Sequence, residues 1–129
     1  DDLQAIKRGV MELADIVVRS IPHRYSHRHC RIHPATRTFQ AVRIAVNREL
    51  EILEAAVHKA INLLKRKGRI IVISFHSLED RAIKLSFRKA EAEGLVELIT
   101  PKPLTAGPVE VQENPSSRSS KLRGAEKIL

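Results

Sequence analysis

The stretch GRIIVISFHSLEDR, residues 68–81, decides the fold class of this chain. Its unbroken β-branched run, Ile70-Ile-Val-Ile-Ser74, is typical of a strand covered on both faces and therefore predicts a parallel sheet. After Ser77 the apolar residues recur at helical spacing until Gly94. They are Leu78, Ala82, Ile83, Leu85 and Phe87. A strand that leads directly into a helix indicates an α/β protein.

The segments before this stretch have the periodicity of helices. Within residues 3–20 the apolar side chains recur every three or four positions, which predicts an amphipathic helix. Pro22 would end this helix. A second apolar stripe runs through residues 36–57 and predicts a single long helix. We expect a further helical turn through residues 60–64, which Gly68 stops.

The segments after this stretch add short strands. Residues 95–99 predict one strand and residues 121–128 another, while the proline-rich segment 101–115 predicts a loop. Alternating helices and strands indicate an α/β fold with three layers. Two strands with their helices make only half of a doubly wound domain, so we expect the chain to be part of a longer protein.

The composition limits the classes of protein that this sequence can represent. It has 129 residues with 43% apolar content, which is enough to bury a core. Because Cys30 is the only cysteine, no internal disulfide can form, and a reducing compartment is favoured. The longest aliphatic run is far shorter than the ~20 residues that span a bilayer, so we expect no membrane segment.

The net charge of +8 is concentrated in one part of the chain. Between Arg19 and Arg48 the sequence has seven arginines and four histidines but no carboxylate. Because arginine pairs bidentately with phosphate, this block favours a nucleic-acid partner over the alternative of a solvated loop. Smaller basic clusters follow at residues 59–69 and 118–127. Few aromatic residues are present, which argues against an RNA module that stacks bases.

A metal site is an alternative interpretation of the same basic block. Its potential ligands are His23, His27, His29, Cys30 and His33. Imidazole and thiolate are usual zinc ligands, but these residues are crowded among arginines and no Cys-x-x-Cys pair accompanies them. We therefore expect no metal.

Polar side chains follow the predicted strand, at the edge where open α/β sheets bind ligands. His76 lies just past the strand end, with Ser74 two residues before it and Ser77 directly after it. We therefore expect His76 to contact substrate or backbone. Ser77 and Asp80 have the spacing of a capping box, which gives both a structural alternative. A Ser/His/Asp hydrolase would need a Gly-x-Ser-x-Gly elbow, and a nucleotide cofactor a Gly-x-Gly turn. The sequence contains neither.

Three segments in this order resemble one protein family. They are HPATRTFQAVRIAVNREL from His33, GRIIVISFHSLEDR from Gly68, and NPSSRSSKLRGAEKI from Asn114. They are similar to the MraW/RsmH family of 16S rRNA (cytosine-N4) methyltransferases. One departure lies before the strand, where family members commonly carry Pro-Gly-Gly and this chain has Arg66-Lys67-Gly68. Another lies in the loop 103–115, and both affect only local turn geometry.

The resemblance implies which part of the enzyme this chain is. Residues 1–31 would be the end of a helical substrate-side insertion with its basic connector. Residues 32–129 would be the second half of a Rossmann-like methyltransferase sheet, in the C-terminal half of the domain. The glycine-rich loop for S-adenosylmethionine and the main catalytic motif would lie in the first half, outside these residues. We therefore expect the chain alone to be inactive.

The resemblance also implies a reaction. The methyl group of S-adenosylmethionine would pass to the N4 amine of a decoding-site cytidine in small-subunit rRNA, without a metal. Such a cytidine has to be unpaired or extruded, and its amine aligned for in-line displacement. A non-catalytic RNA-binding or ribosome-associated module is the alternative, in which the arginine block binds RNA and no methyl donor is used.

On this basis we expect the RNA to contact three groups of residues. Arg37 and Arg43 would bind phosphate, and Gln40 and Asn47 would position the base or its backbone, although a solvated helix face is their structural alternative. The pocket edge would comprise Ser74, His76 and Ser77. A secondary phosphate contact would comprise Lys121 and Arg123.

The expected partners and location follow from the same resemblance. The partner is 16S rRNA or the small ribosomal subunit, and no membrane is involved. Open sheet edges allow a homodimer. The protein would be cytoplasmic in a bacterium, or in the mitochondrial matrix if it is organellar.

Overall fold

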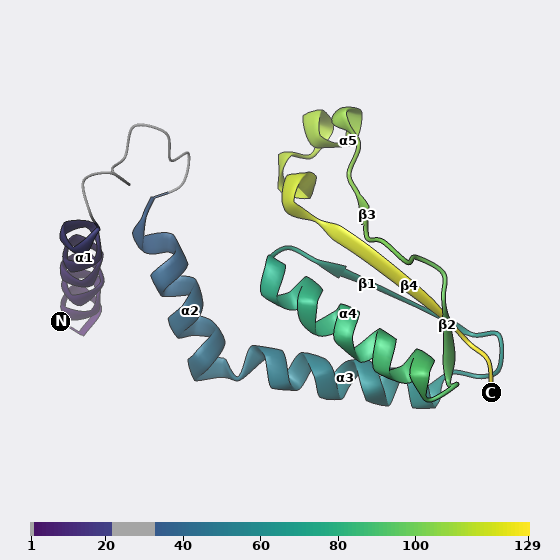
Figure 1. Ribbon diagram of the computed structural model, residues 1–129. Helices are drawn as coiled ribbons and strands as arrows, with labels where there is room; N and C mark the ends of the chain where they lie inside the picture. Colours follow the sequence, from purple (N-terminus) through teal and green to yellow (C-terminus); the bar gives the residue numbers. More distant parts are fainter. Residues whose placement is uncertain (1, 22–32) are drawn as a thin grey trace. The chain divides into compact units, whose positions relative to one another are not determined.

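The computed structural model describes residues 2–21 and 33–129, which form two compact units that are described separately below (Figure 1). The first unit is Asp1–Arg48 and the second is Glu49–Leu129. Most of the basic connector, with His23, His27, His29 and Cys30, lies outside the described residues. The division expected between residues 31 and 32 concerns the family's insertion and stays a prediction.

The first unit contains two helices, α1 (Asp2–Ser20) and α2 (Ala35–Asn47). The predicted helix over residues 3–20 is confirmed as α1, whose apolar residues are largely exposed. In α2, Ala35 and Ile44 are buried. The Nδ1 atom of His33 accepts a hydrogen bond from the Ala35 N–H at 3.3 Å, which satisfies one of the free donors at the start of α2.

The prediction of a single long helix over residues 36–57 is wrong, because the helix is interrupted at Arg48. Arg48 has a φ of 51°, in the left-handed region, and its N–H turns back to the carbonyl groups of Ile44 and Ala45. A residue in this conformation ends a helix. A new helix, α3 (Glu49–Leu63), follows at once and includes most of the further turn predicted through residues 60–64.

The second unit alternates helices and strands after α3. The strand predicted at residues 70–74 is confirmed as β1 (Arg69–Ser74), and the next helix as α4 (Ser77–Ala92). The two later strands are β2 (Val96–Leu98) and β4 (Lys121–Lys127), as expected. The segment predicted as a loop is more ordered. Its elements are β3 (Leu104–Thr105), α5 (Pro108–Glu113) and the 3-10 helix η2 (Pro115–Ser119).

The sheet is antiparallel, so the expectation of a parallel sheet is wrong for the described strands. Its order is β1-β4-β2, with β3 also paired to β4, and all three partners run opposite to β4. β1 and β2 therefore share one direction, as α/β connectivity requires, but the last strand lies between them. A run of β-branched residues favours a strand but fixes neither the burial of both its faces nor the direction of the neighbouring strand, which is why the prediction failed here.

One face of the sheet packs on α3 and α4. The core combines Val57 and Ile61 of α3 with apolar residues of α4 and of the sheet. Those residues are Ile83, Phe87, Ala90, Val96 and Ala125. Ile71 and Ile73 point to the other face and are 62% and 54% exposed, so the second unit has two layers and not the expected three.

Candidate functional site

The candidate site surrounds the carboxyl end of β1, where the chain turns into α4 and β4 begins. Ser74 pairs with Lys121 in the antiparallel register, and its hydroxyl donates to the Lys121 carbonyl at 3.4 Å. Ser74 is 2% exposed. The structure therefore places Ser74 in a closed contact between two strands, whereas the sequence placed it at a pocket edge.

His76 is the N-cap of α4, a role that the sequence analysis gave to Ser77. Its Nδ1 accepts a hydrogen bond from the Glu79 N–H at 3.2 Å. In return, Glu79 Oε2 accepts hydrogen bonds from the backbone N–H groups of Phe75 and His76, at 3.0 and 3.3 Å. This reciprocal capping box lies one residue earlier than expected, because an imidazole replaces the usual hydroxyl or carboxylate cap. The predicted backbone contact of His76 is thus present.

The cap also defines which tautomer a neutral His76 ring adopts. A ring nitrogen that accepts a hydrogen bond carries no proton, so the neutral ring has its proton on Nε2. Nε2 is buried without a hydrogen bond and lies 3.2 Å from Glu79 Oε1. Ser77, the first residue of α4, is exposed. Of the three residues predicted at this edge, only Ser77 therefore faces outward.

A second set of polar groups joins α4 to β4. The buried carboxylate of Asp80 accepts two hydrogen bonds from Arg123. One comes from Arg123 Nε at 2.8 Å and the other from Arg123 Nη2 at 3.2 Å. Lys121 Nζ lies 3.4 Å from the same carboxylate. Asp80 is therefore an ion-pair partner and not part of the capping box. The fork of Arg123, predicted to bind phosphate, is occupied by Asp80.

The electrostatics of this set favour the charged carboxylate. The hydrogen bond and the positive charge of Arg123 hold the pKa of Asp80 below its usual value of 3.8, and Lys121 adds to this effect. Burial acts in the opposite direction but does not outweigh the cations. Of the two cations, Lys121 is the one with its side chain more than a third exposed.

Sequence reasoning missed Glu79 and the partners of Asp80. Glu79 stands three residues after His76, the interval of a capping box, so its signal was present once histidine is allowed as a cap. The pairing of Asp80 with Arg123 joins residues far apart in the chain. Only the register of β4 against β1 brings them together, and no local pattern reports it.

The four residues predicted on the helix after His33 all lie in α2, in the first unit. Arg37, Arg43 and Asn47 are exposed, and Gln40 is half-buried. Their spacing places them along one helix, as expected. The other five predicted residues belong to the second unit, where Lys121, Arg123 and the turn after β1 are joined by the contacts described above.

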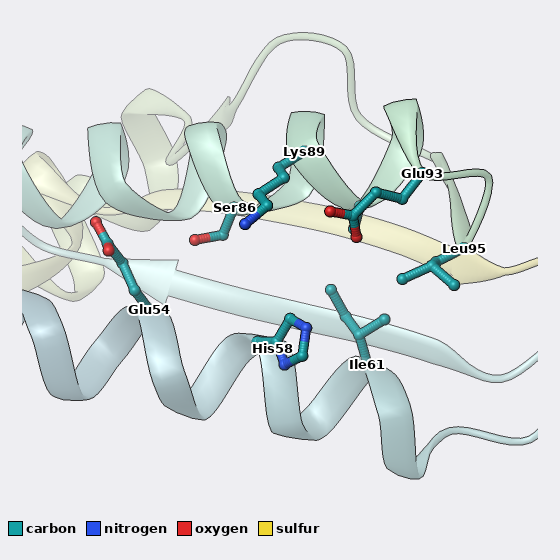
Figure 2. A pocket seen from close by; sticks show the side chains of 8 residues that line it. Glu54, His58, Ile61, Ser86, Lys89, Glu93 and Leu95 are labelled. Atoms are coloured by element: carbon teal, nitrogen blue, oxygen red, sulfur yellow. The ribbon is translucent and has the colours of Figure 1, made fainter.

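A separate pocket lies between α3 and α4, with a volume of about 210 Å³ (Figure 2). Figure 2 shows polar side chains from the two helices facing each other, with the apolar side chains of Ile61 and Leu95 toward one end. Its lining is Glu54, His58, Ile61, Ser86, Lys89, Ala90, Glu93 and Leu95. None of the residues predicted from the sequence lines this pocket.

Comparison with known proteins decides the family. The model of the MraW methylase family matches residues 3–128, nearly the entire chain. The chain belongs to the MraW methylase family. All three segments that carried the resemblance lie inside this match.

Curated relatives of this MraW-family chain share about half of its residues. Ribosomal RNA small subunit methyltransferase H of Sulfurihydrogenibium sp. (strain YO3AOP1) is 54% identical over 91% of the chain. The proteins of the same name from Trichlorobacter lovleyi and Nostoc punctiforme are 47% and 52% identical, each over 92% of the chain. The chain spans only about two fifths of the length of these relatives, between 38% and 42%.

Two glycines of this MraW-family chain, Gly68 and Gly124, do not leave their backbone open to a ligand. Glycines that cradle a nucleotide let a ligand approach the backbone closely. Here Gly68 serves a tight turn against Lys65, and Gly124 lies against Ile99 inside the sheet. Nor do three or more His, Cys, Asp or Glu side chains converge as metal ligands in residues 2–21 and 33–129. Over the same ranges no helix is long and apolar enough to span a membrane.

Proposed function

We propose that this chain is the rRNA-contacting C-terminal part of an enzyme that methylates small-subunit ribosomal RNA. The observation that carries the proposal is the 54% identity, over 91% of the chain, to a protein named ribosomal RNA small subunit methyltransferase H. The arginine-rich composition of the chain, with a net charge of +8, supports an RNA partner independently.

The proposed reaction is transfer of a methyl group to the N4 amine of a decoding-site cytidine in 16S rRNA. S-adenosylmethionine would supply the methyl group from a site in the first half of a Rossmann-like domain, outside this chain. The 129 residues would bind the RNA and hold the extruded cytidine in place, and would be inactive alone. In this division, residues 1–31 belong to the helical insertion.

The site geometry refines the proposed roles. Arg37 and Arg43 on α2 contact phosphate, and Gln40 and Asn47 position the nucleotide. At the end of β1, the exposed Ser77 and the half-exposed Lys121 face the RNA. The remaining three predicted residues shape this edge from within. They are Ser74, which ties β1 to β4, His76, which caps α4, and Arg123, which binds Asp80.

The proposed partners follow from this reaction. 16S rRNA or the small ribosomal subunit is the substrate, and the compartment is the one where the subunit assembles. That compartment is the bacterial cytoplasm, or the mitochondrial matrix for an organellar protein. A homodimer through the open edge of β1 is part of the same proposal.

Calorimetric titration of S-adenosylmethionine tests the division of labour. We expect heat of binding with the complete enzyme and none with the 129-residue chain. A methylation assay on 16S rRNA, run in parallel, should show product only with the complete enzyme. Binding to the short chain would overturn the placement of the cofactor site. A complete protein that binds RNA but neither binds the cofactor nor forms product would support the non-catalytic RNA-binding module.

A further inference from the structure

The turn between α3 and β1 carries three consecutive cations, Lys65, Arg66 and Lys67, here called the basic turn. All three are exposed. From residue 55 to residue 78 the sequence contains no carboxylate. Within the described part of the chain, no Asp or Glu forms an ion pair with these three side chains. Neighbouring positive charges repel each other, and an anion that binds such a cluster relieves this repulsion.

Arg69, the next cation along, shows the contrast. It opens β1, and its Nε lies 2.7 Å from Oε2 of Glu126, its cross-strand partner in the register. Its charge is therefore balanced by a carboxylate on the neighbouring strand, whereas the charges of the basic turn are not. The cations of the basic turn are thus the ones in this segment that can meet an external anion.

The backbone of the basic turn is held firmly. The Gly68 N–H donates to the Lys65 carbonyl at 2.8 Å, which closes the turn. The Lys67 N–H donates to the Lys127 carbonyl at 2.9 Å, and the Lys127 N–H donates to the Gly68 carbonyl at 2.8 Å. These bonds fix the turn to the last strand of the sheet. Side chains on a fixed backbone lose less freedom when they bind than side chains on a loose loop.

Lys67 adopts a backbone conformation that is unfavourable for a residue with a long side chain. Lys67 has a φ of 64°, in the left-handed region, where glycine or asparagine fits better than a long side chain. A turn selected only for folding would favour glycine at this position. A strained backbone occupied by a charged, exposed side chain points to a use for that side chain.

We propose that the basic turn is a second phosphate-binding surface for the ribosomal RNA, in addition to α2; this inference rests on the proposed function. Three adjacent cations fit the phosphodiester backbone, because phosphates recur at short intervals along an RNA strand. Such contacts carry no sequence information and serve to orient the enzyme on its substrate.

A structural role predicts different behaviour. Cations just after the end of a helix also stabilise its dipole. If this were their whole purpose, replacing them would lower the melting temperature and leave RNA binding unchanged. The two roles therefore separate when stability and RNA affinity are measured on the same variants.

The test uses the complete protein and a transcript of a 16S rRNA fragment. The variant Lys65→Gln/Arg66→Gln/Lys67→Gln should reduce the slope of log K against log[salt] by about 2 and weaken binding on the order of 10- to 100-fold at 0.1 M salt. The matched control, Lys84→Gln/Arg88→Gln/Lys89→Gln on α4, removes the same charge and should change the slope less. Affinity for S-adenosylmethionine should stay constant in both variants.

A single substitution sharpens the test. Lys67→Gly places the favoured residue in the left-handed position, so the melting temperature should hold or rise while the salt slope falls by about 0.7. An unchanged slope in the triple variant, or an equal fall in the α4 control, overturns the inference. In that case, continued methylation of 16S rRNA by the unaltered protein leaves the proposed function standing. Absence of methylation by the unaltered protein overturns the proposed function instead.

Discussion

The carboxylate of Asp80 is buried, and it forms ion pairs with two cations of β4. Its carboxylate binds Arg123 through both oxygens and lies near Lys121. Removing one partner of such a buried set leaves the other charge without compensation. The interaction therefore fixes where α4 sits on β4, and with it the turn that carries His76 and Ser77.

We expect Asp80→Asn to lower the free energy of unfolding at pH 7 by about 3 kcal/mol, since it leaves the Arg123 guanidinium buried without a counter-charge. Urea denaturation measures this value. Glu126→Gln removes a partner of the exposed Arg69 and is the matched control, with an expected loss of at most about 1 kcal/mol. Equal effects in the two variants would mean that burial of the Asp80 pair does not matter.

The same carboxylate predicts a pH dependence. In the folded protein the pKa of Asp80 lies below the usual 3.8 that it regains on unfolding, so the unfolded state binds the proton first as pH falls. The stabilisation is complete well above pH 3.8 and is lost as the pH falls through the folded-state pKa. Asp80→Asn should flatten the unfolding free energy between pH 5 and about 2. An unaltered slope there would contradict the ion pair.

His76 caps α4, and the sequence also predicted a contact with substrate at the pocket edge, so two substitutions distinguish these roles. His76→Ala removes the cap of α4 and should cost about 1 kcal/mol of stability. His76→Asn keeps a capping side chain and removes the imidazole, so stability should largely be retained. We predict that turnover of the complete enzyme falls more than RNA affinity in both variants. Normal turnover of the His76→Asn variant would mean that His76 acts only as the N-cap of α4.

Sequence reasoning identified the right residues at the end of β1 but assigned them the wrong partners. It singled out His76, Ser77 and Asp80 at the end of the strand, and all three do lie there. It could not distinguish which residue begins α4, because capping differs by one position between Ser77 and His76. Nor could it pair Asp80 with Arg123, since that contact depends on strand register.

Among the elements, the break between α2 and α3 shows what periodicity leaves open. The apolar stripe continues across Arg48, so the sequence pattern is helical on both sides. The break depends on one left-handed residue, and an arginine there carries no sequence signal, unlike the glycine that usually takes this place. Similarly, β4 was expected as a strand, but its place between β1 and β2 is set by long-range pairing.

Helix α2 carries the proposed primary RNA contact, and its arginines can be tested singly. In the complete enzyme, Arg37→Ala and Arg43→Ala should each weaken RNA binding and lower the salt slope by about 0.7, with unchanged affinity for the cofactor. Lys102→Ala, an exposed lysine of the second unit, is the control. Unchanged salt slopes in both arginine variants would remove α2 from the RNA interface.

The second unit as a whole leaves β1 with an open edge and an open apolar face. In the order β1-β4-β2, β1 pairs only with β4 among the described strands. Ile71 and Ile73 lie on the face that α3 and α4 do not cover. Unpaired edges and exposed apolar surface both favour association. The proposed homodimer would cover exposed surface of this kind.

We expect the 129-residue chain to self-associate, and Ile73→Lys to shift it toward monomer in sedimentation equilibrium, because a charge on the open face opposes its burial. Ile52→Lys, at a similarly exposed apolar position on α3, is the matched control and should leave the mass unchanged. A chain that stays monomeric at every concentration would contradict the homodimer.

The same substitution in the complete enzyme distinguishes two roles of this face, a contact with other parts of the enzyme and a contact between two copies. If other parts of the enzyme cover it, Ile73→Lys lowers the free energy of unfolding, whereas a dimer contact alone leaves the stability of the dilute monomer unchanged.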